Sequence, residues 1–474
     1  MRYIYLFVLT MFVFANSSQA QQASSSFTLE QALAYALENA IDKQNATLDE
    51  RIAEAKVKET IGLGLPQING NASIVHNQKL PRFFTTYDPS GGFIDLSGVP
   101  GIQPGDVVGA QNFFQLKSGG DVGVNINQLI FNGSYLVGLQ ASNAYKELAY
   151  KTTAQTEEKI IQQVSKAFYT VLINRERLDL FDNNIARLDT LLSNTKAQYE
   201  SGFAESIDVD RIRVTYNNLI AERSKFANLN NLGLILLKFQ MNFPLEQELT
   251  VAGTIQDIKI DVDINSYKEG WDYRERADYQ VLEANRRLQQ LNVKNQYAAG
   301  MPVLSANANL GYATQSPNVG GLFRTNTNIE DQFGVGPDKW YNYSSFGLTL
   351  NVPIFSGLQR TYKIKQEKLT LQKIENGFSS LKRAADLEIE QAFTNFDNAQ
   401  KSANWQKENA ELAEKIARVT KIKYEQGVGS NLEVVDAENS LRQAQTNYYS
   451  ALFDLMIAKV DLDKAFGKLK KSSN

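Results

Sequence analysis

The chain has 474 residues, of which 43% are hydrophobic, and its 49 basic and 52 acidic residues leave a formal net charge of -3. This composition supports packed structure throughout, and the near-neutral charge without a long basic run gives no reason to expect a nucleic-acid partner. The absence of cysteine excludes disulfides, thiolate metal sites and thiol catalysis, and the single histidine, His76, lies in a polar stretch with no second ligand type nearby, which favours a structural or surface role.

Residues 1–20 have the pattern of a secretory signal peptide. Arg2 precedes the apolar run "YIYLFVLTMFVFA", and the small residues Ser18 and Ala20 precede a predicted cleavage after Ala20. An uncleaved anchor helix is the alternative, but the run is shorter than the roughly 20 residues that a membrane span requires. We therefore expect the mature chain to leave the cytoplasm.

The remainder of the sequence contains one structural pattern twice. "LPQINGNASIVH" from Leu65 corresponds to "MPVLSANANLGY" from Met301, and "YESGFAESIDVDRIRVT" from Tyr199 corresponds to "YEQGVGSNLEVVDAENS" from Tyr424. Each copy reads as a helix, a strand, a loop, a second strand, a very long helix, a glycine turn and a final helix. We predict an internal duplication with a first repeat at 21–243, a linker at 244–270, a second repeat at 271–467 and a tail at 468–474.

Four segments alternate between apolar and small or polar residues, as strands do. They lie at about 67–77, 120–131, 303–313 and 343–355. Strands of about ten residues with one apolar face are typical of transmembrane barrels, although half-buried strands of a soluble sheet show the same alternation. Four strands are too few to close a barrel, because the smallest bacterial barrels have about eight. If these strands span a membrane, several chains must share one barrel.

The predicted helices are unusually long. They lie at about 134–201 and 206–243 in the first repeat and at about 358–426 and 430–466 in the second. The helix at 134–201 extends roughly 100 Å at 1.5 Å per residue, and its apolar residues follow steps of four and three, which predicts long antiparallel coiled-coil helices. An ordinary antiparallel bundle explains this seam but not its length. The first seam comprises Ile160, Val164, Ala167, Val171, Asn174, Leu178, Phe181, Ile185, Leu188, Leu192, Thr195 and Tyr199.

Each long helix is expected to end at a glycine. Gly202 and Gly427 follow the Tyr-Glu-x pattern and fit the left-handed position after a helix. Ser430 and Glu433 then have the spacing of a capping box for the next helix. We therefore predict the tip of a helical hairpin in each repeat.

These features together resemble the outer membrane efflux protein family, the TolC-like outer membrane factors. The resemblance rests on the signal peptide, the duplicated order of elements, "IFNG" and "IFSG" after the second strands, and Y-x-x-G-x-x-x-x-[DE]-V at the tips, and it covers residues 27–467. It implies a fold that is mainly α with transmembrane β, in which a homotrimer joins twelve strands into one barrel above a periplasmic helical tunnel. It also implies the outer-membrane exit duct of a tripartite efflux pump or type I secretion system, docked to a periplasmic adaptor and to an inner-membrane pump or ABC transporter.

The same resemblance implies roles for residues at the two tips. Glu433 and Asp436 correspond to the acidic residues that close the tunnel, and Asp208 and Tyr424 to a latch between the hairpins. Arg211 departs from the pattern, because it places a base where an acid would complete the gate. The alternative for the acidic residues is that they complement the helix dipole. The tip residues implied in adaptor docking are Tyr199, Gly202, Ser206, Gly427, Gly429 and Asn431.

The main alternative is a periplasmic coiled-coil scaffold or interaction protein without channel activity. An enzyme is not expected, because the sequence has no histidine pair, nucleophile elbow, P-loop or convergent metal ligands, and no cofactor is implied. The family exports drugs, metals, dyes or proteins, and nothing in the sequence selects among them or names the pump.

Overall fold

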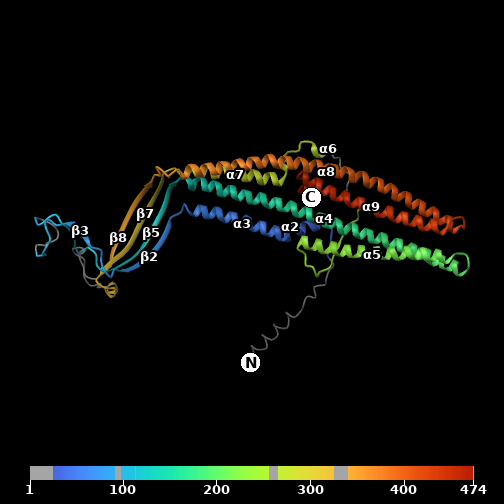
Figure 1. Ribbon diagram of the computed structural model, residues 1–474, viewed down its shortest axis with the longest axis horizontal. Helices are drawn as coiled ribbons and strands as arrows, with labels where there is room; N and C mark the ends of the chain where they lie inside the picture. Colours follow the sequence, from blue (N-terminus) through green and yellow to red (C-terminus); the bar gives the residue numbers. More distant parts are fainter. Residues whose placement is uncertain are drawn as a thin grey trace, which may run out of the picture. The chain divides into compact units, whose positions relative to one another are not determined.

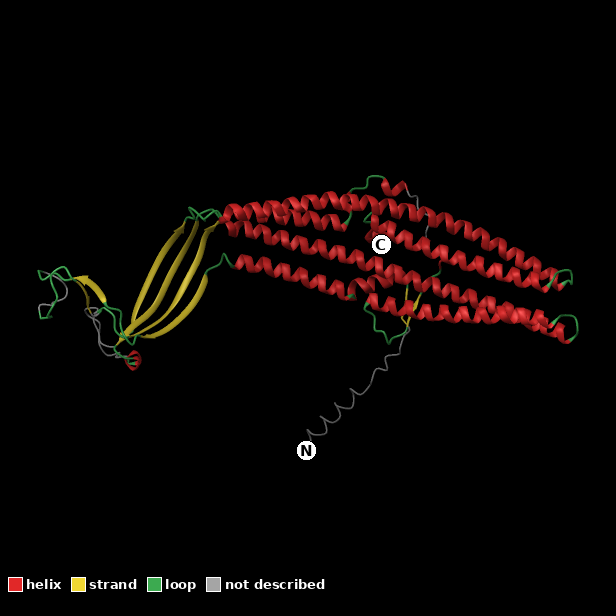
Figure 2. Cartoon of the chain, viewed as in Figure 1, coloured by secondary structure: helices red, strands yellow, loops and turns green. Residues whose placement is uncertain are grey.

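The computed structural model describes residues 25–90, 98–110, 112, 114–255, 265–324 and 340–472, so the predicted signal peptide lies outside the described residues. The chain divides into two compact units. The strand unit comprises Ala55–Asn143 and Gln289–Leu369, and the helical unit comprises the chain up to Glu54, Ala144–Leu288 and the chain from Thr370 onward. Most of the described residues are helical, as the sequence predicted (Figures 1 and 2).

The strand unit contains an antiparallel sheet that mixes the two sequence repeats. Its order is β2-β5-β7-β8, so that the second strand of the first repeat pairs with the first strand of the second repeat (Figure 1). Asn125 lies opposite Asn309 in this central pair. Strands β2 and β8 form the two edges. The strands are β2 Gln67–His76, β5 Ser118–Asn132, β7 Val303–Ser316 and β8 Tyr341–Asn351.

The two faces of this sheet differ in chemistry. Because successive residues of a strand point to opposite faces, the register assigns whole rows of side chains to one face. One row contains Asn69, Asn125, Asn309 and Ser345, and the neighbouring row on the other face contains Ile68, Ile126, Ala308 and Phe346. Phe346 is 78% exposed within the single chain. The sheet thus has one amide-rich face and one apolar face, and the apolar face lacks a cover within this chain's described residues.

A side-chain bridge crosses the polar face. The Tyr343 hydroxyl donates to Asp121 Oδ2 at 2.8 Å, and Asn71 Nδ2 donates to Asp121 Oδ1 at 2.7 Å. The Tyr343 ring lies over β7, where a Cβ at Gly311 would be 2.7 Å from its hydroxyl oxygen. This bridge links β8 to β2 across the two central strands.

The strand-to-helix junctions differ between the repeats. β5 continues directly into α4 (Gly133–Glu200), whereas β8 ends at Asn351 rather than near 355. Pro353 follows the end of β8 and has no N–H to donate to a ladder. The chain then takes a left-handed turn through Gly357 and Leu358 before α8 (Gln359–Glu425) begins.

The segment between β2 and β5, which the sequence predicted as a loop, contains additional structure. β3 (Phe83–Thr86) and β4 (Val107–Ala110) form a short antiparallel hairpin that is separate from the main sheet. His76, at the end of β2, places its Nδ1 2.8 Å from the Ser118 hydroxyl, which agrees with a structural role for this histidine.

The helical unit contains two long hairpins, α4 with α5 and α8 with α9 (Figure 1). A parallel pair of short strands, β1 with β6, joins the beginning of the described chain to the segment expected as a linker. The remaining elements are β1 Ser25–Phe27, α2 Leu29–Asn39, α3 Ile41–Gly62, α5 Ser206–Met241, β6 Leu249–Val251, α6 Asn265–Lys268, η2 Tyr273–Glu275, α7 Ala277–Ala298, η3 Val319–Phe323 (in the strand unit), α9 Asn431–Ala465 and α10 Leu469–Ser472.

The core of the helical unit follows the heptad seam. On α4 the seam residues Val164 and Phe181 are buried, and on α8 Phe396 is fully buried between the buried residues Ala392 and Ala399. Alanine side chains occupy little volume, so the backbones of two packed helices can approach each other closely. No helix among the described residues combines the length and apolarity that a membrane span requires.

Candidate functional site: the hairpin tips and a buried arginine cluster

Both hairpin tips have the same backbone geometry. Gly202 and Gly427 have φ angles of 79° and 76°. At the first tip the Gly202 N–H donates to Tyr199 O at 3.0 Å and the Phe203 N–H donates to Gln198 O at 2.8 Å. The equivalent bonds at the second tip, from the two residues beginning at Gly427, are both 3.0 Å. This pair of bonds defines a Schellman motif, in which a glycine ends the helix.

The helices that leave the tips start differently. The Ser430 hydroxyl accepts the Glu433 N–H at 3.2 Å, which is one half of the predicted capping box. The described contacts of Glu433 do not include the reciprocal bond to the Ser430 N–H. At the first tip it is Asp208 that reaches back, accepting the Glu205 N–H at 3.3 Å. Asp208 therefore caps its own helix, whereas the Glu433 carboxylate remains exposed.

Gly429 is required for packing rather than for an unusual φ angle. A Cβ at this position would lie 3.1 Å from the Tyr424 backbone nitrogen and 3.2 Å from Lys423 Cβ. The turn thus folds tightly against the last turn of α8, and a larger side chain would push the two apart.

Tyr424 joins the second hairpin to the first. Its hydroxyl donates to Gln198 Oε1 at 2.7 Å and lies 3.5 Å from the Thr195 hydroxyl. Asn431 donates to the same Thr195 oxygen at 3.4 Å and is only 7% exposed. Within the described contacts Tyr424 does not meet Asp208, whose nearest base is Arg211 at 3.9 Å. Gln198 was not among the predicted latch residues, and its only signal in the sequence is its position beside the seam residue Tyr199.

Ion pairs continue this connection along α9. Arg442 lies 2.6 Å from Glu222 of α5, and Glu438 lies 3.4 Å from Arg187 of α4. Because both pairs bridge the two hairpins, α9 is held to the first hairpin well beyond the tip.

The predicted gate residues lie on an exposed face of α9. Glu433 and Asp436 are one turn apart, both are exposed, and neither has an ion-pair partner among the described residues. Arg211 of α5, which corresponds to Asp436 in the other repeat, is also exposed. Two carboxylates per chain are thus free to face other groups in an assembly.

Each tip also exposes a matching pair of apolar residues that the sequence analysis missed. Phe203 is 86% exposed and Val428, its equivalent, is 78% exposed. Ile207 and Leu432 are likewise equivalent and exposed. A residue in the position of Phe203 usually packs against the end of its helix, so its exposure at both tips marks an interaction surface. We call these four residues the tip patch.

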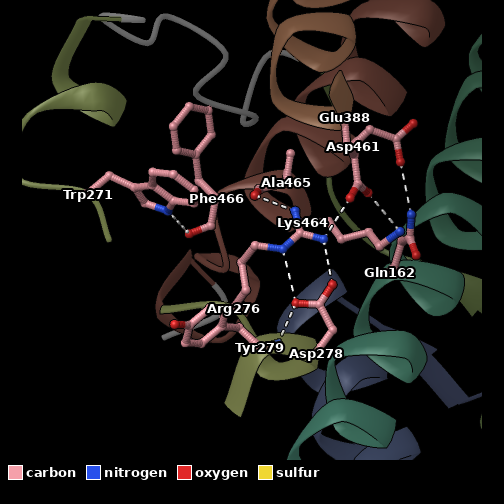
Figure 3. Close-up of polar contacts among 10 residues, drawn as sticks. All are labelled: Gln162, Trp271, Arg276, Asp278, Tyr279, Glu388, Asp461, Lys464, Ala465 and Phe466. Carbon is pink, nitrogen blue, oxygen red and sulfur yellow. Dashed lines mark hydrogen bonds and ion pairs between the residues drawn. The ribbon is translucent and has the colours of Figure 1, made fainter. Parts of the chain in front are cut away.

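A buried arginine connects three helices in the helical unit. Arg276 donates through Nε and Nη2 to Asp278 at 3.0 and 2.8 Å, through Nη2 to Glu388 of α8 at 2.7 Å, and through Nη1 to Ala465 O of α9 at 2.8 Å (Figure 3). Lys464 adds a contact of 3.0 Å to Glu388. Burial disfavours the charge of Arg276, but the bonds to Asp278 and Glu388 outweigh it and raise the arginine pKa. We call Arg276, Asp278, Glu388 and Lys464 the Arg276 cluster.

Residues 274–468 match the family model described as outer membrane efflux protein. The match covers less than half of the chain, and it shows that this part of the chain is similar to that family. The matched segment includes the second tip with Tyr424, Gly427, Glu433 and Asp436, and also the Arg276 cluster. The first tip lies outside it.

Comparisons with whole proteins find relatives of the same kind. The outer membrane protein TolC of Vibrio cholerae is 21% identical over 351 residues, which span 74% of this chain and 77% of the relative. The probable efflux pump outer membrane protein TtgC of Pseudomonas putida is 22% identical over 66% of this chain and 61% of its own length. The open state of the MtrE outer membrane channel of Neisseria gonorrhoeae superposes with a TM-score of 0.69 at 17% identity, covering 94% of this chain and 90% of that one.

These findings establish the fold. The chain has the TolC-like fold that the sequence predicted, and its relatives are outer membrane proteins, which agrees with the predicted location.

Proposed function

We propose that this protein is the outer-membrane exit duct of a tripartite efflux pump or a type I secretion system, and that it works as a passive channel. The observation that carries this proposal is the sheet of the strand unit, which is apolar on one face and amide-rich on the other. Each of its edge strands, β2 and β8, has one hydrogen-bonded neighbour, so its other side is open within this sheet. In lipid, a sheet needs its edges closed, because no water is present to satisfy the free backbone groups. Edge closure between copies favours a homotrimer, in which twelve strands form one barrel.

The tips supply the two further parts of the proposal, docking and gating. The tip patch suits a periplasmic adaptor, because two matching apolar pairs per chain repeat the same surface around a trimer. Glu433 and Asp436 suit a gate, because three chains would bring six carboxylates around one axis. Rings of acidic side chains favour cations in channels.

The experiment that tests the channel and its gate is conductance of the purified protein in planar bilayers, with chemical crosslinking of the same preparation. We expect a trimer on crosslinking and a small, cation-selective conductance that trivalent cations block from the tip side. Asp436→Ala should weaken that block by about tenfold, because each trimer loses three carboxylates. Tyr424→Phe, which removes the hydroxyl bond to Gln198, should increase the fraction of time spent open.

Glu425→Ala is the matched control, since this exposed carboxylate lies at the end of α8 before the turn. It should leave the block unchanged. If Asp436→Ala and Glu433→Ala both match the wild type, the acids serve only the helix dipole and the gate lies elsewhere. A monomer that is extracted without detergent and gives no conductance would favour the periplasmic scaffold.

Docking is tested by capture of the adaptor. Val428→Asp places a charge in the tip patch, and we expect the amount of adaptor that co-purifies with the tagged protein from its own host to fall at least about fivefold. Val99→Asp makes the same change at an exposed position in the segment between β3 and β4 and should leave capture unchanged. Equal capture by both variants would contradict docking through the tip patch.

A further inference from the structure

The bases of the Arg276 cluster are already engaged. Three of the nitrogen atoms of Arg276 are bonded to Asp278, Glu388 and the Ala465 carbonyl, and Lys464 is paired with Glu388. Neither base is therefore free to neutralise another acid at close range. A further carboxylate beside this cluster would lie near the carboxylates of Asp278 and Glu388. The bases Arg276 and Lys464 are already paired within the cluster.

Glu158 of α4 is such a carboxylate. It lines a cavity of about 380 Å³ together with Arg276, Asp278, Glu388 and Lys464. It is only partly exposed, and it forms no hydrogen bond or ion pair within the described part of the chain. The other α4 residues that line the cavity are Gln155, Thr156, Lys159 and Gln162.

The other polar side chains of α4 in and beside this cavity have their own partners. Lys159 is directed to Asp42, at 3.9 Å. Gln162 donates to Asp461 of α9 at 2.9 Å, as Figure 3 shows, and Lys166 also pairs with Asp461. The charged groups that line the cavity with Glu158 are thus Asp278 from α7, Glu388 from α8, Lys464 from α9 and Arg276 before α7, and Lys470 of α10 also acts on the pKa of Glu158.

The neighbouring residue Glu157 provides the contrast. Its carboxylate lies 2.6 Å from both Lys43 and Lys470, one on each oxygen. Burial would raise the pKa of Glu157, but these two ammonium groups outweigh burial and lower it. For Glu158, burial and then the charge of Asp278 raise the pKa to about 7, and the charges of Arg276, Lys464 and Lys470 offset this only in part.

We propose that Glu158 is a proton-binding site that fastens α4 to the Arg276 cluster when it is protonated and loosens this contact when it is ionised. The ionised carboxylate repels Asp278 across the cavity, and it favours water entry because no base forms a hydrogen bond or ion pair with it. Protonation removes the repulsion. Since α4 runs on to the first tip, the strength with which the first hairpin is held to α7, α8 and α9 depends on pH.

The direction of the pH dependence follows from the pKa. Glu158 has a pKa of about 7 in the folded protein and an ordinary value of 4.5 when exposed. The stability that its protonated form contributes is fully present below about 4.5, and it is lost as the pH rises from there through about 7. Glu157 has a lowered pKa, so its contribution is present above 4.5 and is lost only as the pH falls further.

Hydrogen–deuterium exchange of the full-length protein at pH 5.0 and pH 7.5 tests the proposal. After correction for the intrinsic rate, we expect the protection of peptides covering 155–162 to fall at least about tenfold between the two pH values. In Glu158→Gln this fall should disappear, with protection at pH 7.5 close to that of the wild type at pH 5.0. In Glu157→Gln protection should be lower at both pH values, because two ion pairs are lost, but the wild-type fall should remain.

A wild-type protein with equal protection at both pH values overturns the proposal, and so does a Glu158→Gln variant that keeps the full pH dependence. If this variant does not fold, the wild-type comparison of 155–162 with peptides near Leu219 of α5 still decides the matter, because only the former should depend on pH. The exchange measurement does not need channel activity. It therefore succeeds or fails independently of the proposed duct function.

Discussion

Alanine at Gly467 is expected to lower the free energy of unfolding by about 2–5 kcal/mol, through backbone strain and a direct clash. Gly467 has a φ of 68°, and a Cβ there would lie 2.5 Å from the carbonyl oxygen of Glu275. Its N–H donates to Lys464 O at 2.9 Å, and the next N–H donates to Asp463 O at 2.7 Å. The turn after α9 is thus packed against the backbone that precedes Arg276, and neither side has a flexible group that could move.

The matched control is Gly427→Ala. Gly427 has nearly the same φ, 76°, but nothing lies within 4 Å of its added Cβ. This variant should lose only about 1–2 kcal/mol, the cost of the left-handed conformation. Both values can be measured by urea unfolding in detergent, followed by far-UV circular dichroism. Equal losses would show that the contact with Glu275 does not contribute.

Methionine at Arg276 is expected to cost about 3–5 kcal/mol, because removing one partner of a buried ion pair leaves the others uncompensated. The Arg276 side chain is 8% exposed and bonds Asp278 and Glu388. Methionine keeps most of the apolar stem, so the loss reports mainly on the charge. Arg274→Met, two residues away and exposed, should change the stability by less than about 0.5 kcal/mol.

The loss in Arg276→Met should also depend on pH. Burial raises the pKa of Glu388, but Arg276 and Lys464 outweigh it and lower the pKa. This carboxylate therefore stabilises the fold above its ordinary value of 4.5, and the contribution is lost as the pH falls through its folded pKa. We expect the difference between the variant and the wild type to shrink when the unfolding is measured at pH 4. A constant difference would mean that packing, not charge, explains the loss.

The features that the sequence predicts well are those that local patterns encode. Strict alternation placed a strand at about 67–77, where β2 runs Gln67–His76, and the heptad seam placed a helix at about 134–201, where α4 runs Gly133–Glu200. The left-handed geometry of Gly202 and Gly427 follows from the absence of a Cβ.

The features that the sequence does not predict depend on contacts between distant segments. Nothing near Arg276 indicates that Glu388 and the Ala465 carbonyl lie beside it, and nothing near Glu158 indicates that it lacks a base. The two residues of the implied latch, Asp208 and Tyr424, each have another partner here, because Gln198 is closer to the tyrosine hydroxyl and Asp208 caps its own helix. The pairing of β1 with β6 escaped prediction for a simpler reason, since three residues are too few to show alternation.

The order of the sheet limits when it can form. β5 pairs along its length with β7, so that Ser118 meets Ser316, and the intervening chain includes the whole first hairpin. Loop closure over so long a segment is slow, and folding rates fall as the sequence separation of contacts increases. Before the later residues are available, β2 and β5 can form only a two-stranded ribbon, which is at best marginally stable. The helical hairpin between Gly133 and Met241 joins helices that are adjacent in sequence, so it can fold before β7 and β8 are available to complete the sheet with β2 and β5.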